Sequence, residues 1–164
     1  EIIIKNKKRQ EEITINKELL APCGLYCGVC AIHIAHKNDN EKFKEILVNV
    51  YKPFSETADD IHCNGCLSDD IFGYCKICQI RNCTQEKGYE GCYQCDEFPC
   101  KMIEKFPIPV GKIVILRAIP RWKEVGTERW VKEEEERYHC PKCDNPLFRG
   151  AKRCNKCGIS VDVD

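Results

Sequence analysis

Apolar side chains recur at helical spacing in two stretches of the chain. In the first, the spacing is that of an amphipathic helix, with apolar residues at Phe43, Ile46, Leu47, Val50 and Tyr51. Asn38 and Glu41 form the pattern of a capping box before this helix, and Pro53 ends it. We expect it to be the main apolar wall against which the cysteine-rich part packs.

The second stretch, residues 111–138, has apolar residues at intervals of three, namely Ile113, Leu116, Ile119, Trp122 and Val125. This spacing predicts a helix that Pro120 kinks or splits, because proline removes a backbone hydrogen bond inside a helix. Gly126 should end it. A further helix should follow, with Thr127 as its cap, Trp130 and Val131 as its apolar spot, and Glu133 to Glu136 as a solvated face.

Shorter elements are expected elsewhere. They are a strand at Ile13 to Ile15, a helix from Ala31 to His36, a helix from Tyr74 to Lys87 that stops at Gly88, and a helical turn or two around Met102, Ile103 and Phe106. Regular sheet should therefore be scarce in this chain.

Cysteine sets the composition apart, with fifteen among 164 residues. The ordinary core formers are correspondingly few, and such a chain needs metal or disulfide staples. Metal is favoured over disulfide by the odd number, by six pairs of cysteines separated by two residues, and by the lack of a secretory leader at the start. We therefore expect a reduced, cytoplasmic protein. Its net charge of zero gives no global attraction to nucleic acid or membrane, and no apolar run is long enough to span a bilayer.

The tail, residues 139–164, carries two pairs of cysteines ten residues apart, Cys140 with Cys143 and Cys154 with Cys157. A pair separated by two residues supplies two thiolates to one ion, so two pairs complete a tetrahedral zinc site. The spacing predicts a zinc ribbon, in which a small hairpin joins the two knuckles.

Six of the eleven central cysteines form two triplets with a spacing of two and then four residues, and the pattern recurs after 17 residues. The two triplets are Cys75, Cys78, Cys83 and Cys92, Cys95, Cys100, and both follow the pair Cys63, Cys66. Eleven thiols do not divide by four, and His33 is the best twelfth ligand because it continues the spacing of Cys27 and Cys30. One assignment places Cys23, Cys27, Cys30 and His33 in a first site. The triplets then take one ligand each from Cys63 and Cys66, or exchange ligands between sites.

Three to four zinc ions per chain follow from this ligand arithmetic. The alternative is that one or two of the eleven central thiols are simply buried apolar residues. An iron–sulfur or redox protein is the other hypothesis for the central block, because Cys23, Cys27 and Cys30 have the cluster spacing of radical enzymes that use S-adenosylmethionine. The chain lacks the strand–helix alternation of a barrel and the ferredoxin cysteine run, so zinc is preferred. With only four histidines, structural zinc is favoured over a catalytic site.

Nucleic-acid binding through the ribbon is a third hypothesis. It rests on a basic set with one aromatic residue among them: Lys142, Phe148, Arg149, Lys152, Arg153 and Lys156. The alternative is that these residues only keep a small ribbon soluble. An unknown protein partner is the other candidate, and no membrane partner is expected.

Five segments in order resemble a known family. They are Cys-Gly-Leu-Tyr-Cys-Gly-Val-Cys at 23–30, Cys-Asn-Gly-Cys at 63–66, Tyr-Cys-Lys-Ile-Cys-Gln-Ile-Arg-Asn-Cys at 74–83, Lys-Gly at 87–88, and Cys-Tyr-Gln-Cys-Asp-Glu-Phe-Pro-Cys at 92–100. The chain resembles, over residues 21 to about 106, the cysteine-rich family marked by Phe-Pro-Cys, domain of unknown function 3795. The resemblance implies a small intracellular bacterial or archaeal protein with metal sites.

The sequence as a whole predicts a small metal-stapled α+β domain, rich in α-helix, with a helical connector and a C-terminal zinc ribbon. The expected segments are an N-terminal arm (1–20), a cysteine-rich metal-binding domain (21–106), a helical connector (107–138) and the ribbon (139–164). The expected function is structural zinc binding in an adaptor or regulatory protein.

Overall fold

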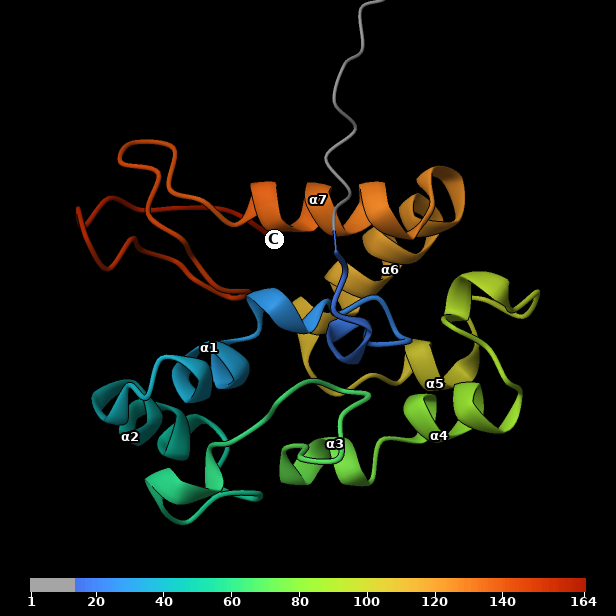
Figure 1. Ribbon diagram of the computed structural model, residues 1–164, viewed down its shortest axis with the longest axis horizontal. Coiled ribbons are helices and arrows are strands. Elements are labelled where there is room, and N and C mark those ends of the chain that lie inside the picture. Colours follow the sequence, from blue (N-terminus) through green and yellow to red (C-terminus); the bar gives the residue numbers. More distant parts are fainter. Residues whose placement is uncertain (1–13) are drawn as a thin grey trace, which may run out of the picture.

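The computed structural model describes residues 14–164, and across them the protein is mostly helical (Figure 1). The α-helices are α1 (Ala31–Lys37), α2 (Glu41–Val50), α3 (Gly73–Lys76), α4 (Gln79–Glu86), α5 (Lys101–Glu104), α6 (Pro109–Val125) and α7 (Thr127–Arg137). The predictions for residues 1–13, including most of the N-terminal arm and a strand beginning at Ile13, lie outside the described residues. Within 14–164, no helix is both long enough and apolar enough to cross a membrane.

Helix α1 confirms the helix predicted after Cys30, but the predicted cap and role of α2 are wrong. The cap is Asn40, whose side chain accepts a hydrogen bond from the Phe43 N–H at 3.0 Å, because Asn38 already ends α1. Helix α2 lies at the edge of the molecule (Figure 1) and buries Leu47 against α1, while Ile46 is 54% exposed and Val50 is 64% exposed. It is therefore not the main apolar wall.

Helix α6 takes that role, and Pro120 does not split it. Its buried side carries Val114, Ile115, Ala118, Ile119 and Trp122. The buried face of α6 differs from the predicted apolar face, since Ile113 and Leu116, two residues of the predicted spacing, are exposed. The N–H that Pro120 lacks would have met the carbonyl of Leu116, four residues earlier. Leu116 is on the exposed side, where water can take the place of that donor, so the helix continues through the proline.

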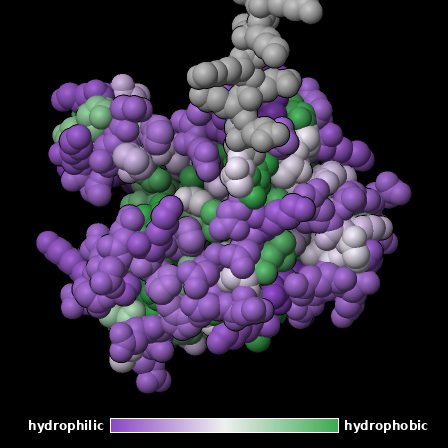
Figure 2. Space-filling model, viewed as in Figure 1, coloured by the Kyte–Doolittle hydropathy of each residue, from purple (hydrophilic) through white to green (hydrophobic). Residues whose placement is uncertain are grey.

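The core around α6 draws on distant parts of the chain. Buried residues from before α1, such as Leu20 and Tyr26, and from the tail, such as Leu147 and Val163, belong to the same cluster as α6. A second, smaller cluster centres on Phe72 beneath α1 and α2. The face seen in Figure 2 is largely hydrophilic, with hydrophobic residues visible between the polar ones. Because Leu147 and Val163 belong to the cluster around α6, the tail is held by the main core.

Two tryptophans join α6 to α7. The rings of Trp122 and Trp130 are stacked, with centroids 4.0 Å apart and planes 8° apart, and both side chains are fully buried. Gly126, in a left-handed conformation, makes the sharp turn between the helices. The Trp122 Nε1–H donates a hydrogen bond to the hydroxyl of Thr127 at 2.9 Å, so Thr127 serves the tryptophan and is not the predicted cap.

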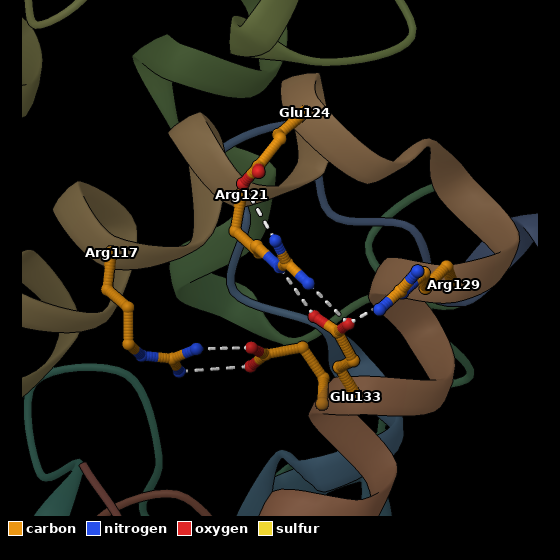
Figure 3. A network of polar contacts seen from close by, with 6 residues as sticks. Arg117, Arg121, Glu124, Arg129 and Glu133 are labelled. Atoms are coloured by element: carbon orange, nitrogen blue, oxygen red, sulfur yellow. Dashed lines mark hydrogen bonds and ion pairs between the residues drawn. The ribbon is translucent and has the colours of Figure 1, made fainter.

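Arginines of α6 reach across to glutamates of α7 (Figure 3). Arg121 donates two hydrogen bonds to Glu133, at 2.8 and 2.7 Å, and Arg129 donates a third at 3.0 Å. Arg117 makes a two-pronged contact with Glu134, which is only 2% exposed. The prediction that Glu133 to Glu136 form a solvated face is therefore wrong for Glu134, because an arginine partner makes its burial tolerable.

Replacing Glu134 by Gln should destabilise the fold more than replacing Glu133 by Gln. Loss of the Glu134 charge leaves Arg117 partly buried without its partner, at a cost of about 3 kcal/mol. Glu133 is more open to solvent, where ion pairs contribute little. Urea unfolding of the two variants, side by side, measures the difference. Equal losses would contradict the importance of the buried pair.

Candidate metal centre

The four tail cysteines converge on one point. Cys140, Cys143, Cys154 and Cys157 have sulfur atoms that all lie within 4.8 Å of one another. The Cys140 and Cys157 sulfurs are 3.6 Å apart, and those of Cys143 and Cys154 are 3.7 Å apart. Four sulfurs in a tetrahedron around zinc, each about 2.3 Å from the ion, lie about 3.8 Å from one another. The quartet is thus spaced for a single zinc ion.

Two knuckle turns build this quartet. The Asp144 N–H donates to the Cys140 carbonyl and the Gly158 N–H donates to the Cys154 carbonyl, each at 2.9 Å. Asp144 and Gly158 both have positive φ, which the tight turn of the backbone after each pair of cysteines requires. Each knuckle therefore presents its two thiols on the same side.

The sheet expected of a ribbon is not formed within residues 14–164. Strand pairing in the tail is limited to two isolated bridges, His139 with Pro146 and Arg153 with Ser160. The backbone beyond the first bridge turns toward the rest of the molecule, where the Arg149 N–H donates to the Val29 carbonyl at 2.9 Å. The strand pairing stops there because the next backbone groups of the tail form hydrogen bonds with the rest of the protein.

The pKa values of two tail thiols are shifted in opposite directions. Backbone N–H groups, first that of Cys157, lower the pKa of Cys154 to about 6. The Asn145 N–H acts in the same direction on Cys143, yet desolvation and the neighbouring thiols raise the pKa of Cys143 to about 12. One thiolate forms readily, and further negative charge beside it requires a cation.

Seven of the central thiols, the seven-thiol group, lie on the segments around η2, the 3₁₀ turn Cys27–Val29, but among the described residues no three of their sulfurs lie within 4.8 Å of one another, so metal binding by them stays a prediction. They are Cys23, Cys27, Cys30, Cys63, Cys66, Cys75 and Cys78. Burial, followed by the charges of Cys27, Cys23, Cys75 and Cys78, raises the pKa of Cys66. The Cys66 N–H also donates to the Cys27 sulfur at 3.3 Å, which links the first knuckle to the second.

Arg149 brings a positive charge from the tail to this seven-thiol group. Its Nη1 donates to the Tyr26 carbonyl at 3.2 Å, and the thiols of Cys30, Cys27 and Cys23 interact with its charge. Sequence reasoning missed this role and assigned Arg149 to nucleic-acid contact. No local pattern marks it, because its partners lie more than a hundred residues away.

The remaining four central thiols, Cys83, Cys92, Cys95 and Cys100, form a third group. Burial, then the charges of Cys23 and of the other three, raises the pKa of Cys92 to about 12. The predicted triplet Cys75, Cys78, Cys83 is therefore divided. The reason is local, since the helix predicted from Tyr74 to Lys87 breaks into α3 and α4 with Cys78 between them, and Cys83 turns toward α5.

His33, the predicted twelfth ligand, lies on α1 with its Nδ1 2.9 Å from the Cys63 carbonyl oxygen. The oxygen can only accept, so Nδ1 carries the proton and Nε2 remains as the ligating atom. The side chain borders an open groove of about 960 Å³ between α1, α2 and the tail. Ligation by His33 stays a prediction.

All fifteen cysteines are free thiols.

Gly65→Ala should destabilise the protein more than Gly88→Ala. Both glycines have positive φ, which costs alanine about 1–2 kcal/mol. A methyl group at Gly65 would also strike the Glu18 carbonyl, whereas nothing lies within 4 Å of one at Gly88. Urea unfolding of both variants measures the difference, and equal losses would contradict a tight knuckle between Cys63 and Cys66.

Comparisons with known proteins place the chain in a family. The chain matches no curated protein and no solved structure. Residues 19–105 match the family described as "Protein of unknown function (DUF3795)", and these residues hold the eleven central cysteines while the tail quartet lies beyond them. Because the match covers more than half of the chain, this cysteine-rich protein belongs to the DUF3795 family.

Proposed function

We propose that this protein is a structural zinc-binding protein whose tail quartet holds one zinc ion. The observation that carries the proposal is the 3.6–3.7 Å spacing of the paired sulfurs, close to that of a zinc tetrahedron. All four ligands come from the chain, which leaves no open position for substrate. The zinc is therefore structural and not catalytic.

The tail has few other means of keeping its shape. Two isolated bridges are its only strand pairing within the described residues. Its apolar side chains Leu147, Ala151 and Val163 nevertheless pack into the main core. The carboxylate of Asp164 accepts hydrogen bonds from the Tyr138 hydroxyl at 2.8 Å and the Gly150 N–H at 2.7 Å. A zinc ion that fixes the knuckles would hold these groups in place, so metal binding and docking of the tail support each other.

Further zinc at the seven-thiol group stays a prediction of the sequence, since among the described residues no three of its sulfurs lie within 4.8 Å of one another. Two tetrahedral ions need eight ligand positions, and seven thiolates fill them if one bridges both ions. His33 as an eighth ligand is the other solution. In either case Arg149 offsets part of the negative charge that the bound thiolates carry.

An adaptor or regulatory role suits a protein with closed metal sites. The basic surface once expected to bind nucleic acid is reduced, because Arg149 is engaged by the domain and Phe148 packs on Phe43 with ring centroids 5.1 Å apart. Lys142, Lys152, Arg153 and Lys156 remain exposed. A protein partner and nucleic acid both stay hypotheses for this surface.

Cys154→Ala should remove one zinc equivalent per chain. Three remaining thiols bind zinc far less tightly than four. Metal analysis after gel filtration measures the loss, with Lys156→Ala as the control because it changes the same knuckle without removing a ligand. Zinc content unchanged in Cys154→Ala would overturn the proposal.

Acid should release the tail zinc and loosen the tail. Protons compete with zinc for thiolates, so the stability that the ion contributes is present at neutral pH and is lost as the pH falls. Up to four protons replace one ion, which makes release steeper than the titration of a single group. A zinc-sensitive dye, followed with thermal unfolding at each pH, measures this. Zinc retained until the whole chain unfolds would contradict a separately bound tail site.

A further inference from the structure

The third thiol group encloses a small cavity. Cys83, Cys92, Cys95 and Cys100 all line it, and its volume is about 50 Å³. Each part of the wall comes from a different element: Cys83 from α4, Cys92 and Cys95 from the 3₁₀ turn Cys92–Gln94 and its end, and Cys100 from the start of α5. Four thiols from three elements therefore face one space.

These thiols are arranged differently from the tail quartet. Among the described residues, the tail quartet is the group in which three or more ligand atoms all lie within 4.8 Å of one another. The sulfurs around the cavity are consequently spread more widely than the roughly 3.8 Å that tetrahedral zinc requires. The sulfurs of the tail quartet are thus at the spacing of a zinc site, whereas the sulfurs of the cavity quartet are farther apart.

The size of the cavity points to a ligand larger than one ion. A cavity that holds one water has about 10–15 Å³ in the same measure, so 50 Å³ is several times that space. A single zinc in contact with four sulfurs leaves no such space between them. An iron–sulfur cluster also takes four cysteine thiolates, but its irons and sulfides stand between them and keep them apart.

The surroundings suit such a cluster. Ile80, Phe98, Met102 and Ile103 supply apolar walls that limit the access of water. Lys87 also borders the cavity, and its charge interacts first with Cys95 and then with Cys83, while its Nζ also lies 3.6 Å from the carboxylate of Glu97, which lines the same cavity. Four thiolates around a cluster leave excess negative charge, and Lys87 offsets part of it.

We propose that Cys83, Cys92, Cys95 and Cys100 bind an iron–sulfur cluster. In binding, each thiol gives its proton to solvent and its sulfur displaces one water or small thiolate from iron, with no change in the oxidation state of sulfur. The proposal replaces zinc at these four residues only and does not depend on zinc in the tail.

The test uses the full chain, purified without oxygen and reconstituted with ferric iron, inorganic sulfide and excess dithiothreitol, which supplies the electrons that a partly ferrous cluster needs. We expect iron and acid-labile sulfide in equal amounts, about two or four of each per chain, together with visible absorbance. Cys95→Ala should lose the bound iron and sulfide, and an unchanged far-ultraviolet circular dichroism spectrum shows that the variant is folded. Cys154→Ala is the matched control and should keep its iron and lose the tail zinc.

Several results would overturn the assignment. Zinc in place of iron at these residues, shown by one zinc lost on Cys95→Ala, would do so. Iron that is lost on Cys27→Ala but kept on Cys95→Ala would place the cluster in the seven-thiol group instead. Absence of bound iron and sulfide after reconstitution would also end the proposal. If Cys95→Ala fails to fold, Cys95→Ser replaces it, and an unchanged visible spectrum would count against the site.

Discussion

Negative charge on closely spaced thiols is the constraint on which this protein depends. A thiolate away from water loses its hydration, and each neighbouring thiolate adds repulsion, so the pKa values of Cys23, Cys27, Cys66 and Cys92 are all raised. A cation reverses both effects, because it replaces water and turns repulsion into shared attraction. Neutral thiols would contribute only weak hydrogen bonds and apolar contact. Among the described residues, the tail quartet is the group spaced to hold such a cation.

The apolar core serves this arrangement by bringing the segments together. Helix α6 passes beneath the first knuckle, and a methyl group added at Gly24 would touch Ile119 and Ala118. The stacked Trp122 and Trp130 fix α7 against α6, and the tail continues from α7 back toward η2. The core thus determines where the tail arrives. Arg149 reaches the seven-thiol group as a result, and one part of the chain supplies positive charge to thiols of another.

The three thiol groups differ in how they are assembled. The tail quartet comes from two knuckles close in sequence, whereas the seven-thiol group draws on segments from Cys23 to Cys78. The group around the cavity lies between α4 and α5 and adjoins the seven-thiol group through Cys23 and Cys92.

The sequence alone determined the features that depend on short segments. A knuckle is a local turn, so the pair Cys140 and Cys143 and the pair Cys154 and Cys157 predicted a four-thiol site. The pattern of apolar residues indicated α1, α5 and the apolar spot at Trp130. Tertiary structure decided which knuckles meet. It moved Cys83 away from Cys75, because α3 and α4 are separate helices, and it buried Glu134 opposite Arg117. It also replaced the ribbon sheet by docking of the tail. Spacing fixes how two neighbouring thiols can grip one ion, but only the packing of distant segments determines which pairs share it.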